Sequence, residues 1–351
     1  MTPLGRLIAE RIAARGPIGL DAYMALCLGH PQLGYYATRD PLGAAGDFVT
    51  APEISQMFGE LIGAWLAQVW DDQGRPERFV LAELGPGRGT LMRDALRAAR
   101  GMPGFLAAAE LWLVETSPAL RARQADLLPG ARWTDSDQEL PDGPLFLVAN
   151  EFFDALPIRQ FQRTDALWRE RLIGAREDGA LHFLWDAPRG DAALDARFAA
   201  VPDGAIVEVS AAGEAVAARI GARIAKAGGA ALILDYGAWD GTGDTFQAVR
   251  GHAPADPLAE PGAADLTAHV RFRALAEVSP ARAHGAVPQG TLLERLGIGA
   301  RARLLATRHP AAAAEIVAAH RRLTHPAEMG EVFKAVALAP SAAPVPPGFA
   351  S

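Results

Sequence analysis

The chain is poor in cysteine: Cys27 is the single one among 351 residues. One thiol excludes an intramolecular disulfide and a zinc site built from several cysteines. Apolar side chains recur at helical spacing over residues 23–28, so we expect Cys27 to be a small buried hydrophobe rather than a reactive thiol. His252, His269 and His284 also lack metal-ligand spacing with Cys, Asp or Glu, and the sequence predicts no metal site.

Long hydrophobic runs are missing as well. No apolar stretch approaches the ~20 residues of a membrane-spanning helix, and the N-terminus lacks the apolar segment of a signal peptide. We therefore expect a cytoplasmic protein of bacterial type without a membrane span. Positive charge is outweighed, with 34 Lys and Arg against 41 Asp and Glu. An acidic chain is a poor nucleic-acid binder, but it remains compatible with a basic substrate such as an arginine-bearing protein tail.

What the sequence does contain is a series of short apolar runs with helical patterns between several of them. Such alternation predicts α/β architecture with a parallel, doubly wound sheet. Each run has a polar residue at its end or one residue before it, at the edge of the sheet where ligands bind in such folds. The four runs cover residues 79–84, 111–115, 145–150 and 230–235, and their polar ends are Glu83, Glu115, Asn150 and Asp235.

The remaining segments suggest three regions. Residues 1–75 form an N-terminal helical region with a cofactor-covering loop, 76–340 form the core, and 341–351 form a disordered tail rich in Ala and Pro. The core carries an insertion at about 157–205, with a hairpin turn at Asp178-Gly179. A second insertion, at about 245–330, is expected to be mainly helix and loop. Residues 332–338 read as an edge strand.

The strongest local motif is Glu83-Leu84-Gly85-Pro86-Gly87-Arg88-Gly89-Thr90, between an apolar run and a helical pattern. Glycines let the backbone approach a ligand closely and present its N–H groups. A dinucleotide fingerprint, G-x-G-x-x-G, would need glycine where Thr90 stands. The observed G-x-G-x-G spacing after an acid resembles motif I of class I S-adenosylmethionine methyltransferases, with Glu83 serving the methionine end of the cofactor.

Glu115 ends the next apolar run, about where doubly wound nucleotide sites place an acid that binds ribose hydroxyls. A carboxylate offers two acceptor oxygens to two neighbouring hydroxyls. Ser117-Pro118 then reads as a helix N-cap followed by proline, which adds Ser117 to the predicted cofactor site. The alternative is that Glu115 is a solvated acid at a strand end.

Longer stretches resemble a specific family, MidA. The similar segments are Gly46-Asp47-Phe48-Val49-Thr50-Ala51-Pro52-Glu53-Ile54-Ser55-Gln56, Asn150-Glu151-Phe152-Phe153-Asp154-Ala155-Leu156-Pro157, His30-Pro31-x-x-Gly34-Tyr35-Tyr36, Asp265-Leu266-Thr267-Ala268-His269-Val270 and Met329-Gly330-Glu331-Val332-Phe333-Lys334. The resemblance extends from about residue 20 to 338. It implies a class I methyltransferase core (a Rossmann-like doubly wound sheet) with an N-terminal helical region, inserted segments and S-adenosylmethionine as methyl donor.

The mitochondrial members of that family are complex I assembly factors that act as protein arginine methyltransferases. The resemblance thus implies a protein substrate, with arginine as the modified side chain and a respiratory complex I subunit as a candidate partner. Two alternatives stay open: an assembly factor that binds the cofactor without turnover, and a nicotinamide- or flavin-dependent oxidoreductase, which Thr90 disfavours. The sequence does not indicate an oligomeric state.

Asn150, Glu151 and Asp154 are the predicted catalytic residues. They lie at the end of the third apolar run and just after it, where methyltransferases place substrate groups, and carboxylates pair with the fixed donors of a guanidinium. Asp154 could instead cap a turn. Asp47, Phe48 and Thr50 are predicted to cover the cofactor, although Thr50 could simply cap the helix that Pro52 begins. Asp235 is left open between ending a strand and a role at the rim of the site. Arg250 and His269 are candidates for binding a substrate or closing the site.

Overall fold

The computed structural model describes residues 1–38 and 50–349. Its contacts group the described residues into two compact units. The first unit comprises those within 1–48, 154–214 and 240–269, and the second those within 49–153, 215–239 and 270–351. Residues 50–75 therefore pack with the sheet that follows them, whereas residues 1–38 pack with the inserted segments. The boundary predicted near residue 75 does not anticipate this division.

The second unit is built on a large sheet. Its main strands run in the order β4 (Arg132–Thr134), β3 (Ala109–Val114), β2 (Phe79–Leu84), β5 (Leu145–Asn150), β10 (Gly229–Ala238), β16 (Phe333–Ala339) and β15 (Arg282–Pro288). The strands from β4 to β10 are parallel, and β16 is antiparallel to both of its neighbours. A short strand, β14 (Val270–Arg271), pairs with the end of β10.

Strand order reverses between β2 and β5, because β3 and β4 extend the sheet to one side and β5 and β10 to the other. Every residue of β2 and β5 is buried, as expected for strands covered on both faces. The point of reversal in a doubly wound sheet is where ligands bind, beyond the carboxyl ends of the strands. The α/β doubly wound fold predicted from the sequence is confirmed.

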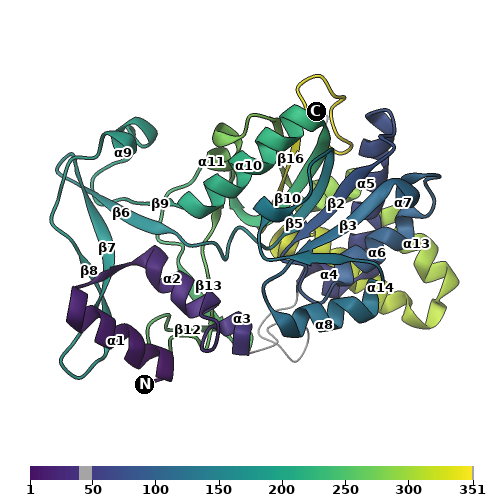
Figure 1. The fold of residues 1–351 in the computed structure, drawn as a ribbon. Helices are drawn as coiled ribbons and strands as arrows, with labels where there is room; N and C mark the ends of the chain where they lie inside the picture. Colours follow the sequence, from purple (N-terminus) through teal and green to yellow (C-terminus); the bar gives the residue numbers. More distant parts are fainter. Residues whose placement is uncertain (39–49, 350–351) are drawn as a thin grey trace. The chain divides into compact units, whose positions relative to one another are not determined.

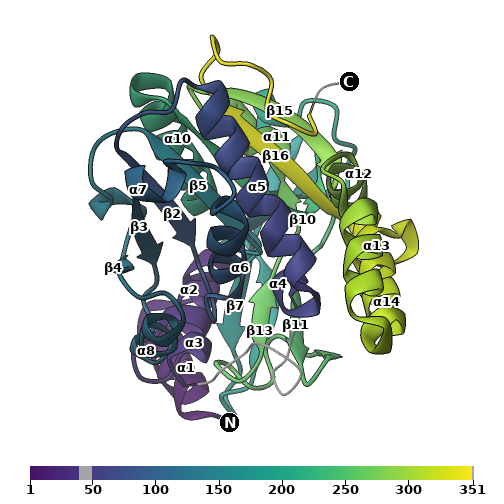
Figure 2. The same ribbon diagram turned by 90° about the vertical axis from the view of Figure 1, so that its right-hand side faces the viewer.

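Helices cover both faces of this sheet (Figures 1 and 2). One face carries α5 (Gln56–Asp72), α6 (Thr90–Ala99) and α13 (Ile298–Arg308), and the other carries α10 (Ala211–Ala227) and α11 (Phe272–Val278). The remaining α-helices of this unit are α4 (Ala51–Ile54), α7 (Phe105–Ala108), α8 (Pro118–Leu127), α12 (Gln289–Arg295) and α14 (Ala313–Thr324). Helices α5 and α6 approach so closely that a Cβ on Gly63 would lie 2.2 Å from the Ala95 carbonyl oxygen.

The first unit contains two smaller sheets. One has the order β1 (Ile18–Gly19), β7 (Leu167–Ala175), β6 (Arg159–Thr164) and β9 (Ile206–Val209), with β8 (Leu181–Trp185) paired to β7; the other has the order β12 (Ala253–Ala255), β11 (Gln247–Arg250) and β13 (Asp265–Thr267). Helices α1 (Pro3–Arg15) and α2 (Leu20–Gly29) pack beside β7 (Figure 1), and α3 (Tyr35–Thr38) and α9 (Ala192–Arg197) complete the unit. Cys27 is buried in the helical core, as predicted.

The structure differs from the sequence-based expectations in three places. Residues 247–288 contain strands where helix and loop were expected. These strands are only two to seven residues long, so they leave little pattern in the sequence. The C-terminal strand β16 is not an edge strand, because it lies between β10 and β15. Its nearly continuous burial agrees with this central position. Residues 341–349, expected to be disordered, pack on the second unit: the Trp65 indole N–H donates to the Pro347 carbonyl at 3.1 Å, and Phe349 is buried.

Candidate functional site

The glycine-rich loop leads directly from β2 into α6. Gly85, Gly87 and Gly89 have φ values of +59°, +54° and +82°, in the left-handed region that other residues rarely adopt. Gly89 is the N-cap residue of α6. A Cβ there would lie 3.1 Å from a Leu128 methyl carbon, and one on Gly85 would lie 3.0 Å from the Phe152 ring. The loop therefore needs glycine both for its backbone conformation and for space, next to a helix N-terminus.

Glu83 lies one residue before the end of β2 and is only 3% exposed. Its Oε2 atom is buried and has no hydrogen-bond partner among the described residues. Burial, followed by the nearby charge of Glu115, raises the pKa of Glu83 to about 8. An unpartnered buried carboxylate oxygen is costly, and a cationic ligand group would relieve that cost.

Glu115 follows β3 directly and is also buried. Its Oε1 accepts the Ser117 N–H at 2.8 Å, and its Oε2 accepts the Gln124 side-chain N–H at 3.3 Å. Burial raises the pKa of Glu115, while these hydrogen bonds oppose the rise. Ser117 is the N-cap of α8, as predicted: its hydroxyl accepts the Leu120 N–H at 3.4 Å. Helix α8 therefore fixes the orientation of the Glu115 carboxylate.

Gln124 connects Glu115 to the glycine loop, and it is absent from the site residues predicted above. Its side-chain N–H groups donate to the Gly87 carbonyl at 2.6 Å and to Glu115, and its carbonyl oxygen accepts the Trp133 indole N–H at 2.8 Å. The residue is completely buried. No local pattern marks it, because its three partners come from separate segments that meet only in the fold.

Helix α4 lies against the same loop. The Thr90 hydroxyl donates to Glu53 Oε1 at 2.5 Å, and the Arg88 guanidinium lies 3.9 Å from Glu53 Oε2. Thr50 occupies the N-cap position of α4, but its side chain makes no capping hydrogen bond. The predicted cofactor-covering residues Asp47 and Phe48 lie outside the described residues. Their neighbour α4 is thus anchored to the glycine loop, mainly through Glu53.

The turn after β5 carries two of the predicted catalytic residues. Asn150 ends the strand, and its Oδ1 is buried without a hydrogen-bond partner among the described residues. Glu151 has a φ of +52°, unusual for a residue with a side chain. Its Oε1 accepts the Ala51 N–H at 3.2 Å and the Asn150 side-chain N–H at 3.1 Å. Glu151 therefore joins the end of β5 to the start of α4.

Asp154 belongs to the first unit, where it is 6% exposed. The backbone carbonyl of Asp154 accepts the Ala268 N–H at 3.0 Å. In the same segment as Ala268, the buried Asp265 accepts a hydrogen bond from the Tyr36 hydroxyl at 3.1 Å. Burial raises the pKa of Tyr36 well above its usual value, and the charges of Asp265 and Asp154 add to this effect. Burial also lowers the pKa of His269. Three stretches of the family resemblance thus meet in the first unit.

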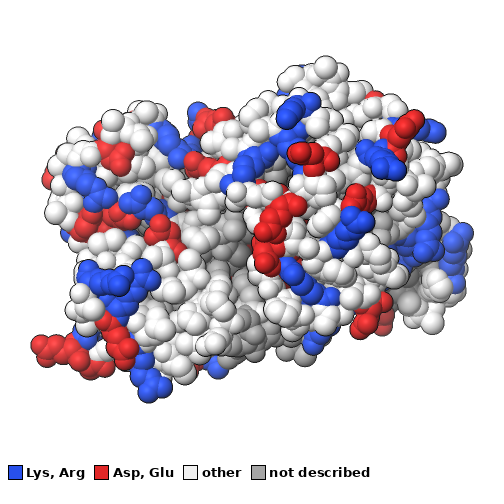
Figure 3. Space-filling model, viewed as in Figure 1, with Lys and Arg blue, Asp and Glu red and all other residues white. Residues whose placement is uncertain are grey.

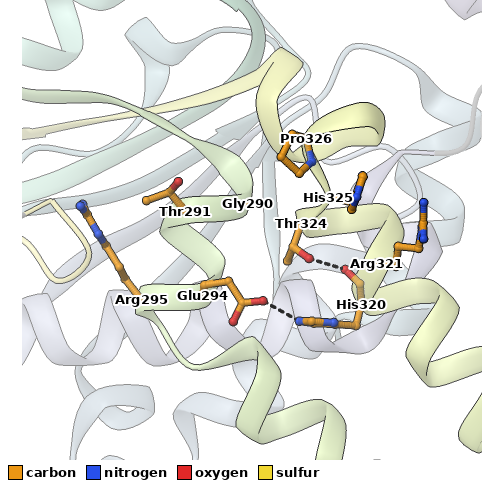
Figure 4. A pocket seen from close by; sticks show the side chains of 9 residues that line it. All are labelled: Gly290, Thr291, Glu294, Arg295, His320, Arg321, Thr324, His325 and Pro326. Carbon is orange, nitrogen blue, oxygen red and sulfur yellow. Dashed lines mark hydrogen bonds and ion pairs between the residues drawn. The ribbon is translucent and has the colours of Figure 1, made fainter.

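A separate pocket in the second unit, with a volume of about 550 Å³, contains none of the predicted site residues. It lies between α12 and α14, where His320 Nε2 and Glu294 Oε1 are 2.7 Å apart (Figure 4). Over the face drawn in Figure 3, basic and acidic side chains of the described residues are interspersed rather than sorted by sign. The described residues include no group of three or more His, Cys, Asp or Glu that could hold a metal ion.

Comparisons with known proteins agree with this geometry. The family model described as "Putative S-adenosyl-L-methionine-dependent methyltransferase" matches residues 61–290. The protein arginine methyltransferase NDUFAF7, mitochondrial, of Danio rerio is 38% identical over 93% of this chain and 84% of its own length. Its Homo sapiens counterpart is 35% identical over 97% of this chain and 84% of its own length.

Solved structures show the same relationship. A crystal structure from Burkholderia thailandensis, bound to S-adenosyl-homocysteine, has a TM-score of 0.81 and 27% sequence identity, covering 100% of this chain and 95% of that one. The fold and these similarities define an S-adenosylmethionine-dependent methyltransferase with a doubly wound α/β core. The chain belongs to this methyltransferase family, as its resemblance to the MidA family implied. The oxidoreductase alternative is thereby set aside.

Proposed function

We propose that this enzyme methylates arginine side chains of a protein substrate. The names of relatives at 35–38% identity over nearly the whole chain support arginine as the substrate. The observation in this chain that carries the proposal is the buried, unpartnered Asn150 Oδ1 beside the Glu151 carboxylate. A guanidinium has five donors and no acceptor, so it suits the acceptor oxygens of Asn150 and Glu151.

The residues present also fit S-adenosylmethionine. Its ammonium would give Glu83 Oε2 the donor that it lacks, and its ribose hydroxyls suit the Glu115 carboxylate. The glycine loop would bring backbone N–H groups close to the methionine end. These assignments rest on Glu83, Glu115 and the loop, with Ser117 acting through Glu115; the roles of Asp47, Phe48 and Thr50 remain predictions.

When bound, the cofactor supplies a methyl group on a positively charged sulfur. A guanidinium nitrogen would accept that methyl group from the sulfur, which leaves S-adenosylhomocysteine, and the N–H proton that it gives up would pass to a nearby carboxylate. Arginine stays protonated in water, so its nitrogen is a poor nucleophile until a positioned group binds the cation and accepts a proton. Glu151 is the group that we assign to this task, with Asn150 orienting the side chain. The participation of Asp154 remains a prediction from the sequence.

The proposed location of the enzyme is the cytoplasm, and its proposed substrate is a protein. A respiratory complex subunit remains the candidate partner that the family resemblance implies. The curated relatives are named as mitochondrial proteins. In the described residues no helix is both long and apolar enough to cross a membrane.

The experiment is to incubate the purified protein with methyl-labelled S-adenosylmethionine and a clarified lysate of its own host. Labelled protein is then hydrolysed, and the methylated amino acid is identified by mass spectrometry. Label in methylarginine supports the proposal, whereas label confined to another amino acid overturns the arginine assignment. Cofactor binding without any label in protein favours the alternative of an assembly factor without turnover.

A further inference from the structure

Asp235 lies in β10 just beyond the point where β5 stops. The two strands are in parallel register up to Leu234, which pairs with Asn150. The next residue on β10 is Asp235, whose side chain is completely buried. It therefore faces the turn that begins at Glu151, at the carboxyl edge of the sheet.

The carboxylate of Asp235 accepts hydrogen bonds from that turn. Its Oδ2 accepts the Phe152 N–H at 3.2 Å and the Phe153 N–H at 2.9 Å. Its Oδ1 accepts the Tyr236 N–H at 3.0 Å. A buried carboxylate that receives several backbone N–H groups holds them strongly, because the bonds are charge-assisted and screened little by water.

These bonds bracket the one residue of the turn with an unusual backbone. The Glu151 N–H donates to the Leu234 carbonyl at 2.9 Å, and the next two N–H groups along the chain go to Asp235. A positive φ at a residue other than glycine persists only when its surroundings over-determine it. The backbone bonds on both sides of Glu151 provide that determination, and they fix where its side chain starts.

We propose that Asp235 is a positioning residue for methyl transfer. By holding the turn after β5, it aims Asn150 and Glu151 at the substrate without touching substrate or cofactor itself. The inference rests on the proposed role of Glu151, but it also makes a structural claim that can be measured without any substrate. It assigns Asp235 a function beyond ending a strand.

The test compares Asp235→Asn with Asp191→Asn. Asp191 is a matched control, because its Oδ1 also accepts two backbone N–H groups, from Ala193 and Leu194, each at 3.0 Å, in the first unit. In Asp235→Asn an amide –NH₂ takes the place of one carboxylate oxygen and confronts a backbone N–H donor. Hydrogen–deuterium exchange at Phe152 and Phe153 should quicken at least about tenfold, while residues 145–149 stay protected.

The second readout is the rate of methyl transfer to the lysate protein that the wild-type enzyme labels. This rate is measured well below the unfolding temperature of each variant. We expect kcat of Asp235→Asn to fall at least about tenfold, with affinity for S-adenosylhomocysteine within about threefold of wild type. Asp191→Asn should keep wild-type kcat. Asp235→Glu keeps the charge but displaces it by one methylene group, so its kcat should also fall. This variant replaces Asp235→Asn in the test if Asp235→Asn does not fold.

Unchanged exchange at Phe152 and Phe153, or unchanged kcat in both Asp235 variants, would overturn the proposal. A parallel loss of cofactor affinity would also overturn the proposal, because it would assign Asp235 to the cofactor site. If wild-type enzyme labels no arginine while the exchange pattern changes as expected, the proposed substrate fails, and the structural claim about Asp235 holds.

Discussion

Glu83 and Glu115 stand at the carboxyl ends of two neighbouring parallel strands, and the charge of Glu115 adds to burial in raising the pKa of Glu83 to about 8. The two acids differ in their surroundings. Glu115 receives hydrogen bonds from Ser117 and Gln124, whereas Glu83 Oε2 has no partner among the described residues. At neutral pH, ligand-free Glu83 is therefore mostly protonated, and a cationic ligand would favour its ionised form.

This relationship predicts that the affinity for S-adenosylhomocysteine rises with pH between about 6.5 and 8.5. The ammonium of the ligand binds best to ionised Glu83, so binding below pH 8 must release a proton. Calorimetry in buffers of different ionisation enthalpy measures both the affinity and the proton release. Glu83→Gln should bind weakly and without this pH dependence. An affinity that does not change with pH in the wild type would contradict the assignment.

The same pKa predicts how the ligand-free protein responds to pH. Native Glu83 holds its proton up to about pH 8, whereas the unfolded chain loses it near the ordinary value of 4.5. The contribution of this group to the free energy of unfolding is thus full below pH 4.5 and is lost as pH rises through 8. Glu83→Gln should flatten the change in denaturation midpoint between pH 6 and 8.5. Equal slopes for the variant and the wild type would count against a buried, protonated Glu83.

Glu115→Ala should weaken cofactor binding by about 1–3 kcal/mol, because it removes a charge-assisted hydrogen-bonding partner. Glu110→Ala is the matched control: Glu110 lies in the same strand, β3, but forms an ion pair with Arg132 at the surface. Titration with S-adenosylhomocysteine compares the two variants. Equal affinities for Glu115→Ala and wild type would reject the ribose assignment and leave Glu115 as an acid that orders α8.

Gln124→Ala should weaken cofactor binding less than Glu115→Ala, by about 1 kcal/mol, because Gln124 acts through Glu115 and Gly87. It should also lower the unfolding temperature, since the Trp133 indole N–H loses its acceptor. The neighbouring Arg123→Ala, on the exposed side of α8, should bind the cofactor like the wild type. A Gln124→Ala protein that is destabilised but binds normally would restrict Gln124 to a structural role.

Glu151→Gln should lower methyl transfer by roughly two orders of magnitude, the scale of losing one preorganised electrostatic contact. The glutamine can still accept the Ala51 N–H through its carbonyl, so cofactor affinity should stay within a few-fold. Asp154→Asn should show a smaller loss of transfer. Initial rates of methyl transfer to the lysate protein that the wild-type enzyme labels are measured for both variants. Normal rates in both would reject the proposal that these carboxylates bind the substrate guanidinium, and loss of cofactor binding in Glu151→Gln would assign that residue to the cofactor site.

The sequence predicted the parts of the fold and of the site that are local. The strands ending near Glu83, Glu115 and Asn150 stand out as continuous apolar runs, and glycine spacing marks the loop after β2. Strand β4 has only three residues and leaves no such signal. The hydrogen bond from Gln124 to Gly87 joins segments 37 residues apart, and the bond from Phe152 to Asp235 joins segments 83 residues apart. Side-chain bonds over such separations depend on the finished sheet, which single-sequence patterns do not describe.

The central claim is that the glycine loop and its two acids bind S-adenosylmethionine. Calorimetric titration of the purified protein with S-adenosylhomocysteine, and in parallel with NADH, tests this most directly, with Gly87→Val as the control that fills the cofactor's space. The account predicts saturable binding of S-adenosylhomocysteine to the wild type, none to a folded Gly87→Val protein, and no detectable binding of NADH. Tight binding of NADH, or no heat with S-adenosylhomocysteine, would contradict it.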